Sequence, residues 1–202
     1  MYPYINPQTH VSYQDSLYNL AQAKHAVQTN FCLRFKSYMA DDFDAITKDY
    51  CKIRRQQLCS ADAFHENSVH DLIFVEFKDK SKEYLDQIGR GTPKIDPSTG
   101  VEEKEETTEV SLHKKAIDSI AVASGTVCNT LPQIAISQGA MFIVVRQDGP
   151  EYFEKIVKGI QTLACLNDRP LWGLVDLINN GIYREVYTVT ESEFGALLAV
   201  IW

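Results

Sequence analysis

The chain has 202 residues, of which 45% are hydrophobic and 10% aromatic, and this length predicts one domain with a substantial core. The formal net charge of -7 argues against binding of nucleic acid or anionic membrane by overall charge, although it leaves room for a local basic groove. The five cysteines show neither CxxC nor Cys/His ligand spacing, so we expect buried thiols in a reducing compartment rather than disulfides or zinc. The first residues lack the features of a signal peptide, and no window reaches the roughly 18 apolar residues of a membrane span. We therefore expect a cytoplasmic protein.

Two helices are predicted in the first part of the chain. Apolar residues recur at helical spacing from Gln14 to about Thr29, and again from Asp41 to about Gln57, where an aspartate can cap the first turn. The N-terminal part, residues 1–57, is therefore predicted to be mostly helical.

The pattern then changes to that of a β-hairpin. Residues 58–66 (LCSADAFHE) show short alternation, a polar turn follows, and residues 72–78 (LIFVEFK) form a second apolar run. The period of two places alternate residues of this second strand on opposite faces, Leu72, Phe74, Glu76 and Lys78 on one and Ile73, Val75 and Phe77 on the other. Two charges therefore lie side by side on one face of an otherwise apolar strand.

The rest of the chain alternates between helices and strands. Residues 79–109 are polar and contain the acidic run EEKEETTE, so they are predicted to be a flexible insertion, or alternatively a mobile flap beside a site. Beyond them we expect helices at 110–126, 149–166 and 171–180, strands at 140–149 and 184–190, and a short last helix opened by a capping box of Thr190 and Glu193. This order predicts a single α/β domain, with a mixed sheet flanked by helices and its core at about residues 58–165.

Charged residues of the hairpin form the first candidate site. Asp62 precedes Glu76 by 14 positions, and antiparallel pairing lets it approach the face of Glu76 and Lys78. Mg²⁺ prefers oxygen ligands from one or two carboxylates and keeps positions for water and phosphate. A neighbouring lysine can activate the attacking water or stabilise developing charge. These residues predict metal-assisted hydrolysis of a phosphodiester.

Four consecutive pieces of the sequence carry a resemblance to a known family. They are Ser60-Ala61-Asp62, Glu76-Phe77-Lys78, the helix LHKKAIDSI and the strand MFIVVR. In this order they resemble the PD-(D/E)xK nuclease superfamily, whose signature is an acid in one hairpin strand, E-x-K in the next, and then a helix. The resemblance covers about residues 60–145, is greatest to poorly characterised microbial or phage proteins, and implies a restriction-endonuclease-like fold.

The resemblance implies a role for each matching residue. Asp62, Glu76 and the backbone carbonyl of Phe77 would bind Mg²⁺ or Mn²⁺, and Lys78 would be the catalytic lysine. Nucleic acid, DNA before RNA, would be the substrate.

Other positions of the pattern are supporting or depart from it. Lys115 and Ser119, one turn apart, would line the same pocket, although an exposed lysine and a small packing residue are the alternative. Ala61 stands where proline is common in the superfamily. The upstream helical acid that many members use has two candidates, Asp44 and Asp49.

The same residues allow less specific interpretations. Glu76 and Lys78 could form an exposed ion pair worth about 0 to 1 kcal/mol. The whole chain could be a catalytically inactive nuclease-fold module for binding or assembly. It could also be an unrelated homodimeric interaction protein without a metal site, since the apolar residues 194–202 either pack on the core or form an interface.

Three further titratable residues lie near the hairpin turn. His65 and His70 have no spaced cysteine or histidine partner, so they are predicted to be exposed turn residues rather than metal ligands. Asp71 is an odd number of positions from Glu76, which predicts a turn residue on the opposite face.

Overall fold

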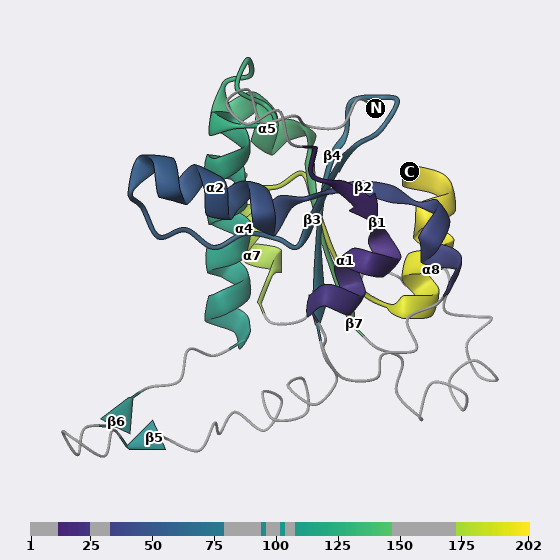
Figure 1. The fold of residues 1–202 in the computed structure, drawn as a ribbon, viewed down its shortest axis with the longest axis horizontal. Coiled ribbons are helices and arrows are strands. Elements are labelled where there is room, and N and C mark those ends of the chain that lie inside the picture. Colours follow the sequence, from purple (N-terminus) through teal and green to yellow (C-terminus); the bar gives the residue numbers. More distant parts are fainter. Residues whose placement is uncertain (1–11, 25–32, 79–93, 96–101, 104–107, 147–172) are drawn as a thin grey trace.

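A six-stranded mixed sheet forms the centre of the molecule (Figure 1). The computed structural model describes residues 12–24, 33–78, 94–95, 102–103, 108–146 and 173–202. The sheet has the order β1-β2-β3-β4-β7-β8 and consists of β1 (Gln14–Ser16), β2 (Met39–Asp42), β3 (Ala63–Glu66), β4 (Leu72–Lys78), β7 (Ala140–Arg146) and β8 (Glu185–Thr190). Neighbours are antiparallel from β1 to β4, and β7 and β8 continue parallel to β4. The predicted α/β class with a mixed sheet is confirmed.

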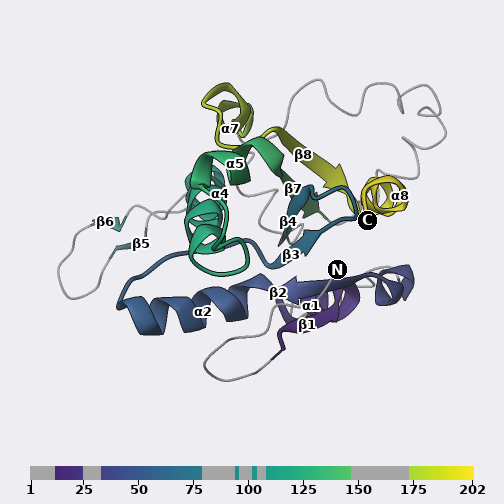
Figure 2. The same ribbon diagram turned by 90° about the horizontal axis from the view of Figure 1, so that it is seen from above.

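Helices cover both faces of this sheet (Figure 2). One face packs against α2 (Phe43–Arg54), α4 (Thr108–Gly125), α5 (Gln133–Gly139) and α7 (Val175–Asn179). The other face packs against α1 (Leu17–Lys24), the 3₁₀ helix η1 (Leu33–Ser37) and α8 (Glu191–Ile201). Each face therefore has its own hydrophobic cluster, and the central strands β4 and β7 between them are buried on both sides.

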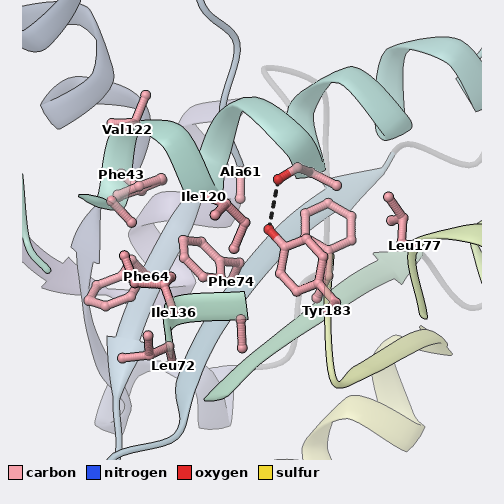
Figure 3. Packing of buried hydrophobic residues seen from close by; sticks show 14 of the residues in the cluster. Phe43, Ala61, Phe64, Leu72, Phe74, Ile120, Val122, Ile136, Leu177 and Tyr183 are labelled. Atoms are coloured by element: carbon pink, nitrogen blue, oxygen red, sulfur yellow. Dashed lines mark hydrogen bonds between the residues drawn. The ribbon is translucent and has the colours of Figure 1, made fainter. Parts of the chain in front are cut away.

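The predicted alternation along β4 is observed. Leu72 and Phe74 belong to the cluster under α2 and α4, whereas Ile73, Val75 and Phe77 belong to the cluster under α1 and α8. Figure 3 shows the first cluster, in which the Tyr183 hydroxyl donates a hydrogen bond of 2.8 Å to the carbonyl of Ala116 on α4. This hydrogen bond satisfies a fully buried hydroxyl, and it joins α4 to the residues that lead into β8.

The described residues of the N-terminal part are mostly helical, as predicted, but they also contribute two short strands that were not predicted. Residues 14–16 pair with β2, so α1 begins at Leu17 rather than at Gln14. The second helix begins at Phe43, where the side chain of Asp42 accepts a hydrogen bond of 2.9 Å from the Ala45 N–H and caps the first turn. The sheet and its core therefore extend upstream of residue 58.

Other boundaries also differ from the prediction. The first hairpin strand covers only Ala63–Glu66, α7 is shorter than expected, and the short helix α5 was not predicted. The helix α4, the strand β8 and the capping box of Thr190 and Glu193 at the start of α8 are confirmed. Within the predicted insertion, β5 (Lys94–Ile95) pairs antiparallel with β6 (Glu102–Glu103). The rest of residues 79–107 and the helix expected at 149–166 lie outside the described residues.

The C-terminal helix packs on the core. Phe194 and Leu198 of α8 are buried in the cluster that contains Phe77, and Leu197, Ile201 and Trp202 pack against it. In the part of the chain that the structure describes, no helix combines the length and the apolar character needed to cross a bilayer.

Candidate active site

The structure brings two carboxylates and two ammonium groups together beside β4. The ammonium nitrogen of Lys115 lies 2.6 Å from Oε1 of Glu76 and 4.0 Å from Oδ1 of Asp62. That of Lys78 lies 3.1 Å from the same oxygen of Glu76. Glu76 is 1% exposed and Asp62 is 3% exposed. Asp62, Glu76, Lys78 and Lys115 are referred to below as the carboxylate–ammonium cluster.

The backbone around Asp62 fixes the position of its side chain. Asp62 lies just before β3 rather than within it, but its N–H still donates to the Val75 carbonyl at 2.9 Å. Its own carbonyl accepts from the N–H of Phe43, the first residue of α2, at 3.1 Å. Its side chain reaches across to β4, where Oδ2 accepts a hydrogen bond of 2.8 Å from the Phe77 N–H. The start of α2 and the strand β4 thus hold one carboxylate in place.

The backbone N–H of Phe77 donates a hydrogen bond to Asp62 of the cluster, whereas its side chain packs on the face of the sheet that is covered by α1 and α8. The Phe77 ring packs edge-on against Phe194 of α8, with 6.4 Å between ring centroids. Coordination of a metal by the Phe77 carbonyl stays a prediction.

One turn of α4 holds the chain that leads into Asp62. Oγ of Ser119 accepts a hydrogen bond of 2.9 Å from the Ala61 N–H and donates one of 2.7 Å to the carbonyl of Lys115. Oδ2 of Asp118 accepts a hydrogen bond of 2.9 Å from the Cys59 N–H. Ser119 is fully buried, so it positions the chain rather than simply lining a pocket. Sequence reasoning had not assigned this role to Asp118, although Asp118 directly precedes Ser119 in the candidate helix.

The two candidates for the helical acid have different surroundings. Asp44, in the first turn of α2, pairs with Lys48 at 2.8 Å, and its charge helps to raise the pKa of Lys115. Asp49 accepts hydrogen bonds from the Tyr13 hydroxyl and the Lys52 ammonium, which lower the pKa of its carboxyl group. Asp44 is therefore the candidate that acts electrostatically on the cluster.

The charges of the cluster balance one another. Burial lowers the pKa of Lys115, but the Glu76 and Asp62 carboxylates outweigh this effect and hold the pKa above its usual value. Lys115 is therefore charged at neutral pH and serves as a counter-ion between the two carboxylates.

One oxygen of the cluster has no partner among the described residues. Oε2 of Glu76 is buried and accepts no hydrogen bond there, whereas Oε1 contacts both lysines. A buried carboxylate oxygen is costly to leave unpaired.

Within the same described residues, no group of three or more His, Cys, Asp or Glu side chains is arranged to hold a metal ion. Two carboxylates are nevertheless enough for Mg²⁺, which retains several waters. Asp62 and Glu76 therefore fit such a cation by the chemistry of their oxygen donors.

His65 lies outside the cluster and is buried, contrary to its prediction as an exposed turn residue. Its side chain lies in β3, where its ring stacks on Trp202 with 3.9 Å between centroids. Burial lowers the pKa of His65 to about 4. The prediction failed because the residue that covers His65 is at the far end of the chain.

The other residues of the turn also lie apart from the cluster. His70 is exposed as predicted, and its Nδ1 lies 2.7 Å from Oε1 of Glu66. Asp71 forms an ion pair of 2.7 Å with Arg184, just before β8.

The fold and the site define an α/β protein with a mixed sheet and a buried carboxylate–ammonium cluster at β4. No family model, curated protein or solved structure matches this chain.

Proposed function

We propose that the protein is a metal-dependent nuclease with a PD-(D/E)xK type of site, acting on DNA in preference to RNA. The observation that carries the proposal is the meeting of Asp62, Glu76 and Lys78 on one hairpin with Lys115 of the following helix. The chain order of hairpin, α4 and β7 is also the order of the superfamily to which the sequence shows its resemblance. A restriction-endonuclease-like fold is part of the same proposal.

The position of the cluster in the sheet supports binding of a ligand. The parallel strands β4, β7 and β8 end in register at Lys78, Arg146 and Thr190. Ligands of open α/β sheets bind outside the carboxyl ends of such strands. Glu76 and Lys78 occupy that end of β4.

Each residue of the cluster has a chemical role in this proposal. Asp62 and Glu76 would hold Mg²⁺ or Mn²⁺, which when bound neutralises phosphate charge and makes water more acidic. Lys78, which is part-exposed at the end of β4, would donate hydrogen bonds to a phosphate oxygen and stabilise its developing charge. Lys115 would hold Glu76 in place and supply a second positive charge.

A calorimetric titration with Mn²⁺ tests the metal ligands. We expect wild type to bind Mn²⁺, and Glu76→Ala or Asp62→Ala to bind at least tenfold more weakly, equivalent to about 1.4 kcal/mol. Asp71→Asn is the matched control because its carboxylate lies outside the cluster, and it should bind like wild type. Unchanged binding by folded Glu76→Ala would refute the assignment.

An assay of DNA cleavage tests the role of the lysine. Lys78→Ala should retain Mn²⁺ binding and lose 10²-fold or more in cleavage rate, on the order expected for removal of one charge-stabilising group. A rate equal to that of wild type would exclude Lys78 from the chemistry.

A second candidate is a catalytically inactive module of the same fold that binds nucleic acid or takes part in assembly. The balance of two carboxylates by two lysines favours this candidate, because the formal charges of the cluster sum to zero without a metal. Folded wild type that binds no Mn²⁺ would favour it over the nuclease.

A cytoplasmic location also belongs to the proposal. Among the described residues, Cys51, Cys59 and Cys128 are free thiols, which is typical of a reducing compartment.

A further inference from the structure

A stripe of charged residues runs along α2 away from the carboxylate–ammonium cluster. Asp44, Lys48 and Lys52 follow one another at intervals of four residues, and Arg55 caps the helix. Side chains at this interval are neighbours on one face of a helix, with about 5–6 Å between Cβ atoms. The side chains of Lys48 and Lys52 are 67% and 76% exposed, and Arg55 is exposed. At 1.5 Å per residue, the stripe is roughly 16 Å long.

The stripe begins next to the cluster, because the N–H of Phe43, which directly precedes Asp44, donates a hydrogen bond of 3.1 Å to the carbonyl of Asp62. A hydrogen bond to Asp44 raises the pKa of Lys48, and the charges of Asp42 and Asp62 raise it further. Asp44 in turn acts on Lys115. One end of the stripe therefore shares its electrostatic environment with the cluster.

The other end of α2 extends past α4 (Figure 1). The ring of Tyr50 lies against Gly125 at the end of α4, where an added Cβ would come within 2.6 Å of it. Beyond this contact, the residues from Lys52 to Gln57 are all exposed. The basic end of the stripe is therefore open to a large partner.

The sign of the charge on this segment is opposite to that of the chain as a whole. Residues 43–55 contain four basic side chains (Lys48, Lys52, Arg54 and Arg55) and two acidic ones (Asp44 and Asp49), whereas the chain carries a formal net charge of -7. The two aspartates are part-buried, but they pair with the exposed ammonium groups of Lys48 and Lys52, and ion pairs that are open to water on one side are weak. These lysines can therefore exchange a carboxylate partner for a phosphate.

We infer that the exposed face of α2 formed by Lys48 and Lys52, together with Arg55 at the C-terminal end of the helix, binds the phosphodiester backbone of nucleic acid and leads it to the cluster. The inference rests on the proposed function, since it assigns the surface that would hold the substrate of that site. Backbone contacts carry no sequence information, so this face would bind nucleic acids of any sequence.

The salt dependence of DNA binding tests the inference. A short fluorescein-labelled DNA duplex is titrated with the protein in EDTA, and anisotropy gives the affinity at several salt concentrations. Lys48→Gln/Lys52→Gln/Arg55→Gln should lower the slope of log K against log salt by about 2 to 3, because each phosphate contact contributes roughly 0.9. Lys52→Gln alone should lower it by about 1.

A matched control separates this face from general charge. Lys36 of η1 is also exposed but lies on the opposite face of the sheet, over the ring of Tyr18. Lys36→Gln makes the same change in net charge as Lys52→Gln and should leave the slope unchanged. An equal loss in both variants would overturn the inference.

The remaining outcomes separate this inference from the nuclease proposal. Wild type that does not bind the duplex, or a triple variant that binds with an unchanged slope, would overturn the inference even if Mn²⁺ binding and cleavage were found. Binding through α2 without Mn²⁺ binding or cleavage would support the inference and refute the nuclease.

Discussion

Ser119→Ala is the substitution whose effect on stability follows most directly from the structure. It removes the acceptor of the Ala61 N–H and the donor to the Lys115 carbonyl. Ala61 and Ser119 are both fully buried, so water cannot easily replace the missing hydroxyl. The variant therefore leaves a backbone N–H unsatisfied inside the protein.

The expected magnitude combines two opposing effects. A buried polar group without a partner costs about 1–3 kcal/mol. Alanine is the better helix former and returns about 0.5 kcal/mol. The free energy of unfolding should therefore fall by about 0.5–2.5 kcal/mol, which for a chain of this size lowers Tm by roughly 1–10 °C.

Urea unfolding followed by circular dichroism measures this loss. Ser124→Ala is the matched control, because Ser124 lies on the same helix and, among the described residues, its hydroxyl makes a single hydrogen bond, which it donates to the carbonyl of Ala121. It makes the same chemical change without orphaning an N–H from another segment, and should be within about 0.5 kcal/mol of wild type. If Ser119→Ala and Ser124→Ala were equally stable, the hydrogen bond between the Ala61 N–H and Ser119 of α4 would not contribute to stability.

Three other predictions test separate features. Lys115→Met removes the ammonium that contacts Glu76 at 2.6 Å, so calorimetry should show Mn²⁺ binding about tenfold tighter; weaker binding would mean that Lys115 does not compete with the cation. Because the pKa of His65 is about 4 in the folded chain and about 6.5 when unfolded, the neutral ring favours folding. The free energy of unfolding should therefore fall as pH drops from about 6.5 to 4. Urea titrations of His65→Gln should show a smaller fall over this pH range, and a fall equal to that of wild type would show that His65 does not cause it. Thr190→Ala removes the capping bond from the Glu193 N–H and should cost about 1 kcal/mol in thermal melting, with an unchanged Tm as the contrary result.

The parts of the fold that could be predicted are those with a local pattern. The alternation of Leu72 and Ile73 between two apolar faces follows from strand geometry alone. The capping box of Thr190 and Glu193 is likewise visible within four residues. The strands β1 and β2 escaped prediction because their 3 and 4 residues are too short to show a period and adjoin helices.

The parts of the site that could not be predicted depend on contacts between distant segments. Asp118 accepts a hydrogen bond from Cys59, 59 positions away, and no local pattern indicates this pairing. The choice between Asp44 and Asp49 depends on the direction in which α2 leaves the sheet. Asp62 and Glu76 could be proposed because the geometry of paired strands brings them together. The hydrogen bonds from Cys59 and Ala61 to α4 could not be proposed, because they depend on how α4 packs against the sheet.

The location of the cluster on β4 links its survival to the folding of the whole domain. β4 pairs with β3 on one side and with β7 on the other, where Glu76 is in register with Val144. Backbone amides of such an interior strand exchange with solvent only in large-scale opening. We therefore expect hydrogen exchange near Glu76 to be among the slowest in the chain. Local fraying at the ends of the sheet would then leave the cluster intact, and its geometry would be lost in a single step with cooperative unfolding.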